Sequence, residues 1–133
     1  MISVQKSALQ FRRLIGFVSL FLLLSVACKK EKTENIPTVL TVSVTEITSN
    51  TAKVSIKVTA DGGATVTGTG VCWGISVNPD LTNNVSNVGG GLGDFIAILN
   101  SLQQNTIYHV RAFATNNAGT AYGADLSFTT QYQ

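Results

Sequence analysis

Residues 102–119 read LQQNTIYHVRAFATNNAG and carry the strongest fold signal in the chain. Apolar and polar side chains alternate through much of this stretch, which is the pattern of a strand with one buried face. The face expected to be buried carries Tyr108, Val110, Ala112 and Ala114. The sequence Asn-Asn-Ala-Gly at 116–119 then supplies residue types that favour a tight turn. The stretch therefore predicts a strand that ends in a turn.

The same alternation recurs from residue 38 onward and is broken by turn residues at short intervals. The expected strands cover about 40–45, 53–59, 66–75, 81–88, 94–99, 108–115 and 121–130. Residues 61–63 are expected to form a hairpin turn, and the glycine-rich 89–93 a flexible connection. The strand over 66–75 is expected to place Val71, Trp73 and Ile75 on one face. About seven short strands in this length predict an all-β, immunoglobulin-like sandwich of two sheets.

One local pattern resembles the fibronectin type III family. Leu102, Thr106 and Tyr108, followed by the alternating strand and its turn, are similar to the corner that leads into that family's sixth strand. The closing segment 126–130 also resembles the family's last strand. The resemblance implies that the Tyr108 hydroxyl bonds back to the backbone at the corner. Gln104 stands where the family has a proline.

A second departure concerns tryptophan. The family's usual tryptophan lies in the second strand, whereas here Trp73 lies in the third expected strand and is expected to fill the core instead. The chain also has no Arg-Gly-Asp sequence, so integrin binding does not carry over from the family. The resemblance therefore implies a divergent fibronectin type III-like sandwich over residues 38–133.

The N-terminal part of the chain differs in composition from the rest. Lys6, Arg12 and Arg13 precede the uncharged run LIGFVSLFLLLSVA at 14–27, and Cys28 follows directly. A basic head and a short apolar run are the pattern of a cleaved export signal. A retained transmembrane helix is the alternative, but it needs about 20 apolar residues. Residues 1–27 are therefore predicted to be a signal peptide with a helical apolar region.

The residues before Cys28 resemble a bacterial lipobox, in which a small residue precedes a cysteine that becomes lipidated. Ser25 stands where Leu is usual and Leu24 lies one step further out, a looseness that resembles lipoprotein signals of the Bacteroidetes. The resemblance implies lipidation of Cys28, and two or three acyl chains are enough for stable membrane attachment. Cys72 then has no disulfide partner, and we expect it to pack as a small apolar residue.

A polar segment separates Cys28 from the expected domain. Residues 29–37, KKEKTENIP, have no apolar face, so 28–37 are predicted to be a lipidated cysteine and a flexible tether. The expected partner of this segment is the membrane, reached through the lipid anchor. Lys29 after the cysteine favours the outer membrane of the cell envelope. Whether the domain faces the periplasm or the cell surface stays open at this point.

Charge excludes one class of partner. From Cys28 onward six basic residues stand against seven acidic ones, so the net charge is −1. There is no basic patch to attract a phosphate backbone, which argues against nucleic-acid binding. His109 is the only histidine, and the sequence nominates no aligned serine and acid for a triad. We expect no enzyme activity, no cofactor and no metal site.

Two outward-facing groups are the candidate binding residues. His109, Arg111 and Phe113 would form a stripe on one sheet, where an aromatic beside a cation suits protein or glycan contact, although ordinary cross-strand pairing explains it too. Ile96 and Ile98 would face outward on another strand while Phe95, Ala97 and Leu99 face inward. The isoleucine pair is expected to be either an interface or a surface covered by a neighbouring loop.

The expected function is that of a lipid-anchored cell-envelope module that binds a protein partner or sister copies. The alternative is a carbohydrate-capture lipoprotein, for which the candidate aromatic rings are Phe113, Tyr122 and Tyr132. Exposed rings lying in one plane would favour glycan binding, and buried rings would count against it. A small hydrolase would need a pocket that joins His109 to an acid.

Overall fold

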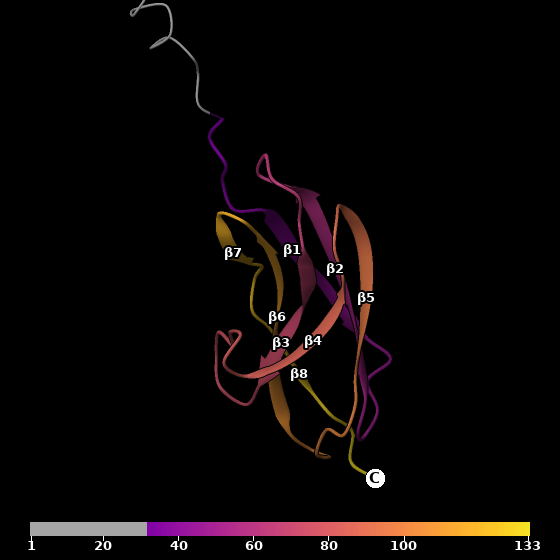
Figure 1. Cartoon of the computed structure of the whole chain (residues 1–133). Coiled ribbons are helices and arrows are strands. Elements are labelled where there is room, and N and C mark those ends of the chain that lie inside the picture. The colour runs from indigo at the N-terminus through magenta and orange to yellow at the C-terminus, as the bar shows by residue number, and fades with distance from the viewer. Residues whose placement is uncertain (1–31) are drawn as a thin grey trace, which may run out of the picture. The chain divides into compact units, whose positions relative to one another are not determined.

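The computed structural model describes residues 32–133, and Thr33–Gln133 form one compact unit. The predicted signal peptide 1–27, its helical region, Cys28 and the first part of the tether lie outside the described residues. The described residues form eight strands in two sheets. Figure 1 shows how the two sheets face each other. Within this part of the chain, no helix is long and apolar enough to cross a membrane.

The strands form a three-stranded and a five-stranded antiparallel sheet. The first has the order β1-β2-β5, with β1 (Thr38–Thr45), β2 (Ala52–Ala60) and β5 (Gly93–Leu99). The second contains β3 (Gly68–Gly74), β4 (Asn84–Gly89), β6 (Ile107–Asn116), β7 (Gly119–Tyr122) and β8 (Leu126–Thr129). Its order is β4-β3-β6, and β7 and β8 both pair with β6. The predicted all-β, two-sheet immunoglobulin-like sandwich is therefore confirmed.

The core lies between the two sheets and is built from alternate residues of each strand. β2 contributes three side chains that are at most 2% exposed, namely Val54, Ile56 and Val58. The facing sheet contributes Val71, Val110, Ala112 and Ala114, all fully buried. Trp73 packs against this core but stays half-buried. Removing this apolar surface from water is the main stabilising contribution to the sandwich.

The tyrosine corner forms as the family resemblance implies. The Tyr108 hydroxyl accepts a hydrogen bond from the backbone N–H of Gln103 at 2.9 Å. The Tyr108 ring is 8% exposed and stacks on Phe128, with 5.8 Å between the ring centroids. The corner therefore holds the 101–106 connection against β6 although Gln104 replaces the usual proline.

Two local predictions about turns and strand ends are wrong. Residues 61–63 do not form a hairpin, because β2 and β3 belong to different sheets and the turn carries the chain between them. The third strand ends at Gly74, so Ile75 is not on its inner face but is 73% exposed. A turn motif encodes only a local reversal, and both a hairpin and a crossover between sheets satisfy it.

The last predicted strand is divided into β7 and β8, and the division raises the strand number to eight. The backbone N–H of Gly123 still donates to Ala112 O at 2.9 Å, after which the chain leaves the sheet until Leu126. Thr41 on β1 fills this interruption, because its hydroxyl accepts from Ala112 N and donates to Ala124 O. The edge of one sheet is therefore hydrogen-bonded to the other.

The end of the predicted tether is part of the domain. Asn35 donates its backbone N–H to Gly62 O at 2.8 Å, and the Asn116 side chain donates to Asn35 O at 2.7 Å. The same amide donates to Asp61 O, and Pro37 is buried. These contacts place the start of the folded domain before the expected boundary at residue 38.

Candidate binding surfaces

The predicted stripe on the outer face of the five-stranded sheet is held in internal contacts. The Arg111 guanidinium carbon lies 4.7 Å from the centre of the Tyr122 ring, a cation–π contact between neighbouring strands. Arg111 Nε also donates to Gly123 O at 3.0 Å. Both contacts fix Arg111 against β7, so much of its side chain is already engaged within the domain.

The predicted outward exposure of Phe113 is wrong, because its side chain is only 3% exposed. Phe113 does lie on the outer face, opposite Gly70 of β3 and Tyr122 of β7. Gly70 has no Cβ, and a Cβ placed there would lie 2.9 Å from Phe113 Cε1. The ring therefore occupies the space above a glycine and is not available to a partner.

His109 makes a contact that the sequence did not indicate. Its Nδ1 lies 3.0 Å from both carboxylate oxygens of Asp125, and the two side chains are 19% and 17% exposed. Asp125 Oδ2 also accepts the backbone N–H of Asn78 at 2.8 Å. Within residues 32–133, this pair hydrogen-bonds to the backbone of a loop, and neither member hydrogen-bonds to a serine or cysteine side chain. Only the pairing of β6 with β8 brings these two residues together.

That loop is the β3–β4 loop (residues 75–83), and it is fastened at several points. Besides the Asn78 contact, Leu81 donates its N–H to the Tyr122 hydroxyl at 3.3 Å. Pro79 is fully buried within this segment. Asp80 accepts from the Thr82 hydroxyl and backbone, and these hydrogen bonds hold the pKa of Asp80 below its ordinary value. The loop is therefore held in one conformation against the sheet.

Cys72 lies on the same outer face as Arg111 and is fully buried. Burial raises the pKa of its thiol to about 11, with the Asp80 carboxylate adding to the rise and Arg111 opposing it. The thiolate is the nucleophilic form of cysteine, so this environment suppresses reactivity. The expectation that Cys72 packs as a small apolar residue is confirmed.

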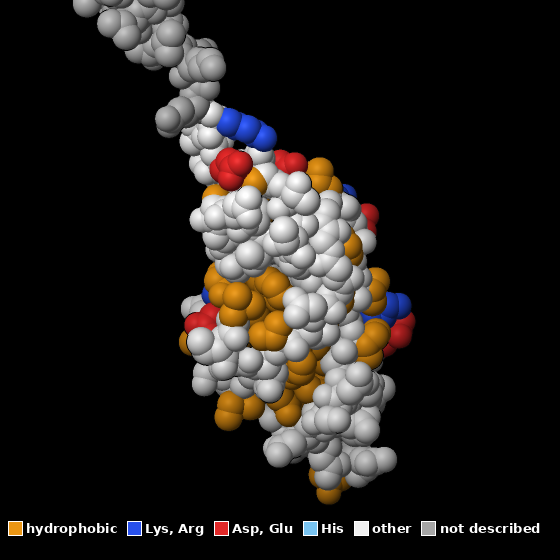
Figure 2. Space-filling view, in the orientation of Figure 1, with side chains coloured by type: hydrophobic (Ala, Val, Ile, Leu, Met, Phe, Trp, Pro, Cys, Tyr) orange, Lys and Arg blue, Asp and Glu red, His pale blue; other side chains and the backbone are white. Residues whose placement is uncertain are grey.

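The fastened loop presents apolar side chains to solvent. Ile75 is 73% exposed and Val77 is 66% exposed, while Leu81 is partly covered at 43%. Figure 2 shows further apolar side chains gathered over the part of the molecule where Figure 1 labels β3 and β6. Exposed aliphatic residues on an ordered loop are typical of a contact surface.

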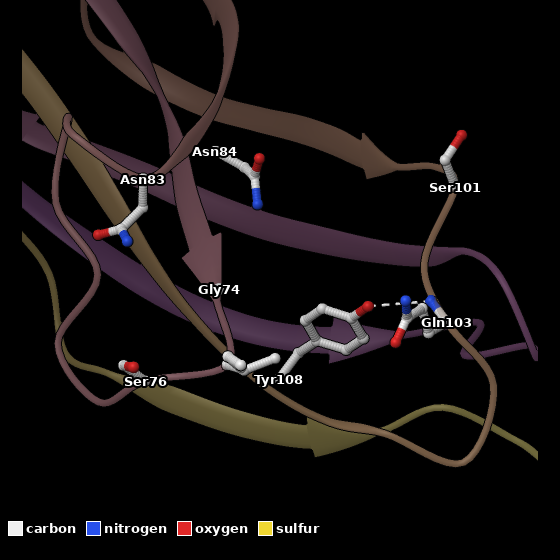
Figure 3. Close-up of a pocket in the computed structure, with 8 residues that line it drawn as sticks. Gly74, Ser76, Asn83, Asn84, Ser101, Gln103 and Tyr108 are labelled. Carbon is white, nitrogen blue, oxygen red and sulfur yellow. Dashed lines mark hydrogen bonds between the residues drawn. The ribbon is translucent and has the colours of Figure 1, made fainter.

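A cleft of about 420 Å³ lies beside the loop, between the β3–β4 and β5–β6 connections. In Figure 3, Asn83 and Asn84 approach it from one side, and Ser101 and Gln103 from the other. All the lining side chains are uncharged: Ile75, Ser76, Asn83, Asn84, Ser101, Gln103 and Tyr108, beside Gly74. Sequence reasoning missed this cleft because its walls are distant in the chain. Amide and hydroxyl groups suit a neutral polar ligand such as a peptide backbone or a sugar.

Ile96 and Ile98 face outward as predicted, and each is 49% exposed. Within the described residues neither is buried by a loop, which leaves them available to a partner. Leu40 and Val42 on β1 carry similar exposure, 47% and 54%. Lys57 bridges to Asp94 at 3.8 Å and Lys53 to Glu46 at 3.0 Å. The outer side of the three-stranded sheet is therefore aliphatic with an ion pair toward each end.

The three candidate aromatic rings, Phe113, Tyr122 and Tyr132, do not form a platform for a sugar. Phe113 is buried, and Tyr122 is half-buried with Arg111 over its ring. Tyr132 is 79% exposed but lies alone at the end of the chain. Among residues 32–133, no group of three or more His, Cys, Asp or Glu side chains is placed to hold a metal ion.

No family model matches this chain, and no curated protein matches it. Several solved structures, however, resemble it in fold. A myokine structure is 20% identical and covers 75% of this chain and 100% of its own, with a TM-score of 0.54. The sensor domain of an anti-sigma factor from Pseudobacteroides cellulosolvens is 16% identical and covers 76% and 100%, with a TM-score of 0.53.

A fibronectin type III domain of human collagen XX gives the same result. It is 17% identical and covers 77% of this chain and 100% of its own, with a TM-score of 0.53. At such identities the likeness concerns the fold alone, and the fold is one that many proteins use for different functions. The chain has the immunoglobulin-like sandwich fold of fibronectin type III domains.

Proposed function

We propose that this chain is a non-catalytic protein-binding module that is held at the cell envelope by lipid on Cys28. The module contacts its partner through the β3–β4 loop. The observation that carries the proposal is the loop's geometry. Its backbone is fastened by Asp125 and Tyr122, yet Ile75 and Val77 point into solvent. A loop ordered before binding loses little conformational entropy on binding, which raises affinity.

The cleft beside the loop supports the same function. A partner segment that covers Ile75 and Val77 would reach Asn83 and Asn84 at the cleft. The Asn84 side chain donates to Trp73 O at 3.3 Å, and its Oδ1 is free to accept from a ligand amide. An apolar contact bordered by a few polar groups is the usual composition of a protein interface.

The anchor rests on the sequence around Cys28. A short apolar run, a cysteine and a polar segment lead directly into a compact domain whose first fastened residue is Asn35. Such a spacer lets the domain stand just outside the lipid headgroups. Because Lys29 follows the cysteine, the proposed envelope location is the outer membrane, with the domain on the periplasmic face or the cell surface.

Metabolic labelling with an alkyne fatty acid tests the anchor. The full chain should incorporate the label, Cys28→Ala should lose it, and Cys72→Ala should keep it. Trypsin added to intact cells would then release the domain only if it faces outward, because the tether lysines Lys29, Lys30 and Lys32 are cleavage sites. Equal labelling of the chain and of Cys28→Ala would overturn the lipid anchor.

Site-specific photo-crosslinking tests the binding loop. A photoreactive residue at position 77 should form an adduct with a discrete envelope protein, and the adduct should disappear when Ile75→Ser is added. The matched control is position 92, since Leu92 is 56% exposed on a connection between the sheets. Identical adducts from positions 77 and 92 would contradict the proposal that the loop is the binding surface.

Glycan binding is the second candidate, and the neutral lining of the cleft is the observation that favours it. Asparagine amides and serine hydroxyls hydrogen-bond sugar hydroxyls well. The burial of Phe113, one of the three candidate rings, counts against it. A glycan array probed with the chain and with Asn84→Ala distinguishes the two functions. Binding that requires Asn84 supports a glycan site, and silence across the array removes it.

A further inference from the structure

The two sheets have four edges, and three of them are protected against further strand pairing. β1 carries two register shifts against β2, and Thr41 hydrogen-bonds it to Ala112 and Ala124. The β4 edge shifts register against β3. The opposite edge of that sheet is divided into β7 and β8, of four residues each. Bulges, short strands and covering contacts are the usual means by which proteins block edge-to-edge association.

The fourth edge, β5, has no register shift, and within the described residues no hydrogen bond from the other sheet covers it. Its seven residues pair with β2 in an unbroken register from Leu99 opposite Ala52 to Gly93 opposite Val58. It contains no proline and no lysine, the two residues most often used to blunt an edge. Within the described residues, the other edge of β5 makes no backbone hydrogen bond from 94 to 99. Its outward side chains include Ile96 and Ile98.

We propose that β5 pairs with β5 of a second copy of this chain, antiparallel and with Ala97 opposite Ala97. In that register Ile96 of each copy faces Ile98 of the other, so four half-exposed isoleucines cover one another. Asp94 faces Asn100 of the second copy, and no like charges oppose. The half-buried Phe95 faces Leu99 on the inner side.

Other registers are less favourable. Moving the axis to Ile96 places Ile98 opposite Asp94 of the second copy, which sets an aliphatic side chain against a carboxylate. A shift by a single residue is excluded, because it would set outward residues of one copy beside inward residues of the other. Moving the axis to Ile98 would set Ile96 opposite Asn100 of the second copy, an aliphatic side chain against an amide. The strand is therefore most self-complementary with Ala97 on the axis, as a two-fold interface requires.

The pairing has a defined geometry. It joins two three-stranded sheets into one continuous sheet of six strands, and the β3–β4 loop, which belongs to the other sheet, is not part of the paired edge. Because the paired strands are antiparallel, the residues that lead into β1 emerge at opposite ends of the dimer. Self-association through β5 thus leaves the proposed partner-binding loop free.

Cysteine crosslinking in the full chain tests the interface. In the double variant Ile96→Cys/Ile98→Cys, each new thiol lies across from one in the second copy, so mild oxidation should give a covalent dimer on a non-reducing gel. The matched control is Leu40→Cys/Val42→Cys, two positions of similar exposure on the same sheet but at the protected edge. Both variants keep Cys28 and Cys72, so dimers through native thiols appear equally in both.

The expected result is a dimer yield at least several-fold higher for the β5 pair than for the β1 pair. Equal yields, or a β5 pair that stays monomeric, would overturn the proposal. Slow labelling of Cys72 until denaturant is added shows that each variant is folded, since that thiol is fully buried.

Substitutions at Asn100 test the register itself. Asn100 is exposed and lies just after β5, and the proposed pairing sets it against Asp94 of the second copy. Asn100→Lys should raise the yield of the Ile96→Cys/Ile98→Cys dimer, because two new ion pairs form across the axis. Asn100→Asp should lower it through two like-charge contacts. Equal yields from the two variants would overturn the proposed register.

Discussion

The hydroxyl of Thr41 accepts a hydrogen bond from the backbone N–H of Ala112 at 2.9 Å. The same hydroxyl donates to Ala124 O at 2.7 Å. Ala112 is fully buried, and the sheet ladder is interrupted where β7 leaves β6. A side chain from the other sheet therefore satisfies a backbone group that the interrupted strand leaves without a partner.

Replacing this hydroxyl should destabilise the domain. Thr41→Val keeps the shape of the side chain but leaves the Ala112 N–H buried and without an acceptor, which costs about 1–3 kcal/mol in the free energy of unfolding. Thr41→Ser keeps the hydroxyl and should lose much less. Denaturant unfolding of both variants measures the difference, and equal stabilities would contradict the role given to the hydroxyl.

The tyrosine corner predicts a difference between two otherwise similar substitutions. Tyr108→Phe removes the acceptor of the Gln103 N–H and should lower the free energy of unfolding by about 0.5–1.5 kcal/mol. Tyr132→Phe is the matched control, because Tyr132 is 79% exposed at the end of the chain. The thermal midpoint should fall for the first variant and stay unchanged for the second.

Two glycines of β3 should respond differently to alanine. A Cβ at Gly70 would lie 1.9 Å from Ser86 O and 2.9 Å from Phe113 Cε1, whereas a Cβ at Gly68 meets nothing within 4 Å. Gly70→Ala should destabilise the fold by about 1–3 kcal/mol or more, through displacement of β4 and the phenylalanine ring. Gly68→Ala should be tolerated. Comparable unfolding midpoints for the two variants would rule out the close packing described over Gly70.

The Asp125 carboxylate should stabilise the β3–β4 loop against local opening but should not affect the stability of the core. Asp125→Ala removes the acceptor of the Asn78 N–H and the partner of His109. Hydrogen exchange at Asn78 should then accelerate while amides of β2 remain protected, because the loop opens locally. Asp94→Ala removes only an exposed ion pair with Lys57 and should leave the Asn78 exchange rate unchanged.

Cys72 predicts a loss of stability at alkaline pH. The pKa of the thiol is about 11 in the folded domain, whereas its ordinary value is 9.0. Both states hold the proton below pH 9, and above it the unfolded chain loses its proton first, so stability falls as pH rises from about 9 toward 11. Cys72→Ala should lack this part of the pH dependence. Parallel pH profiles for the two proteins would show that the thiol does not contribute.

Much of the strand pattern follows from local chemistry. Alternation over 108–115 and 94–99 places Val110, Ala112, Ala97 and Leu99 inside, because side chains of a strand point to opposite faces. The same rule correctly places Ile96 and Ile98 outside. The Leu102 to Tyr108 corner is also local, since the hydroxyl and the N–H that it accepts from are five residues apart.

Whether an outward-facing side chain is exposed or covered depends on contacts between segments that are distant in the sequence. Alternation puts Phe113 on the outer face correctly, but its burial requires Gly70 opposite it. His109 acquires Asp125 only through the pairing of β6 with β8. The cleft and the fastened loop likewise join residues that are separated by a strand or more. Periodicity tells which side of a sheet a residue faces, and only the packing of one chain segment on another tells whether that side is covered.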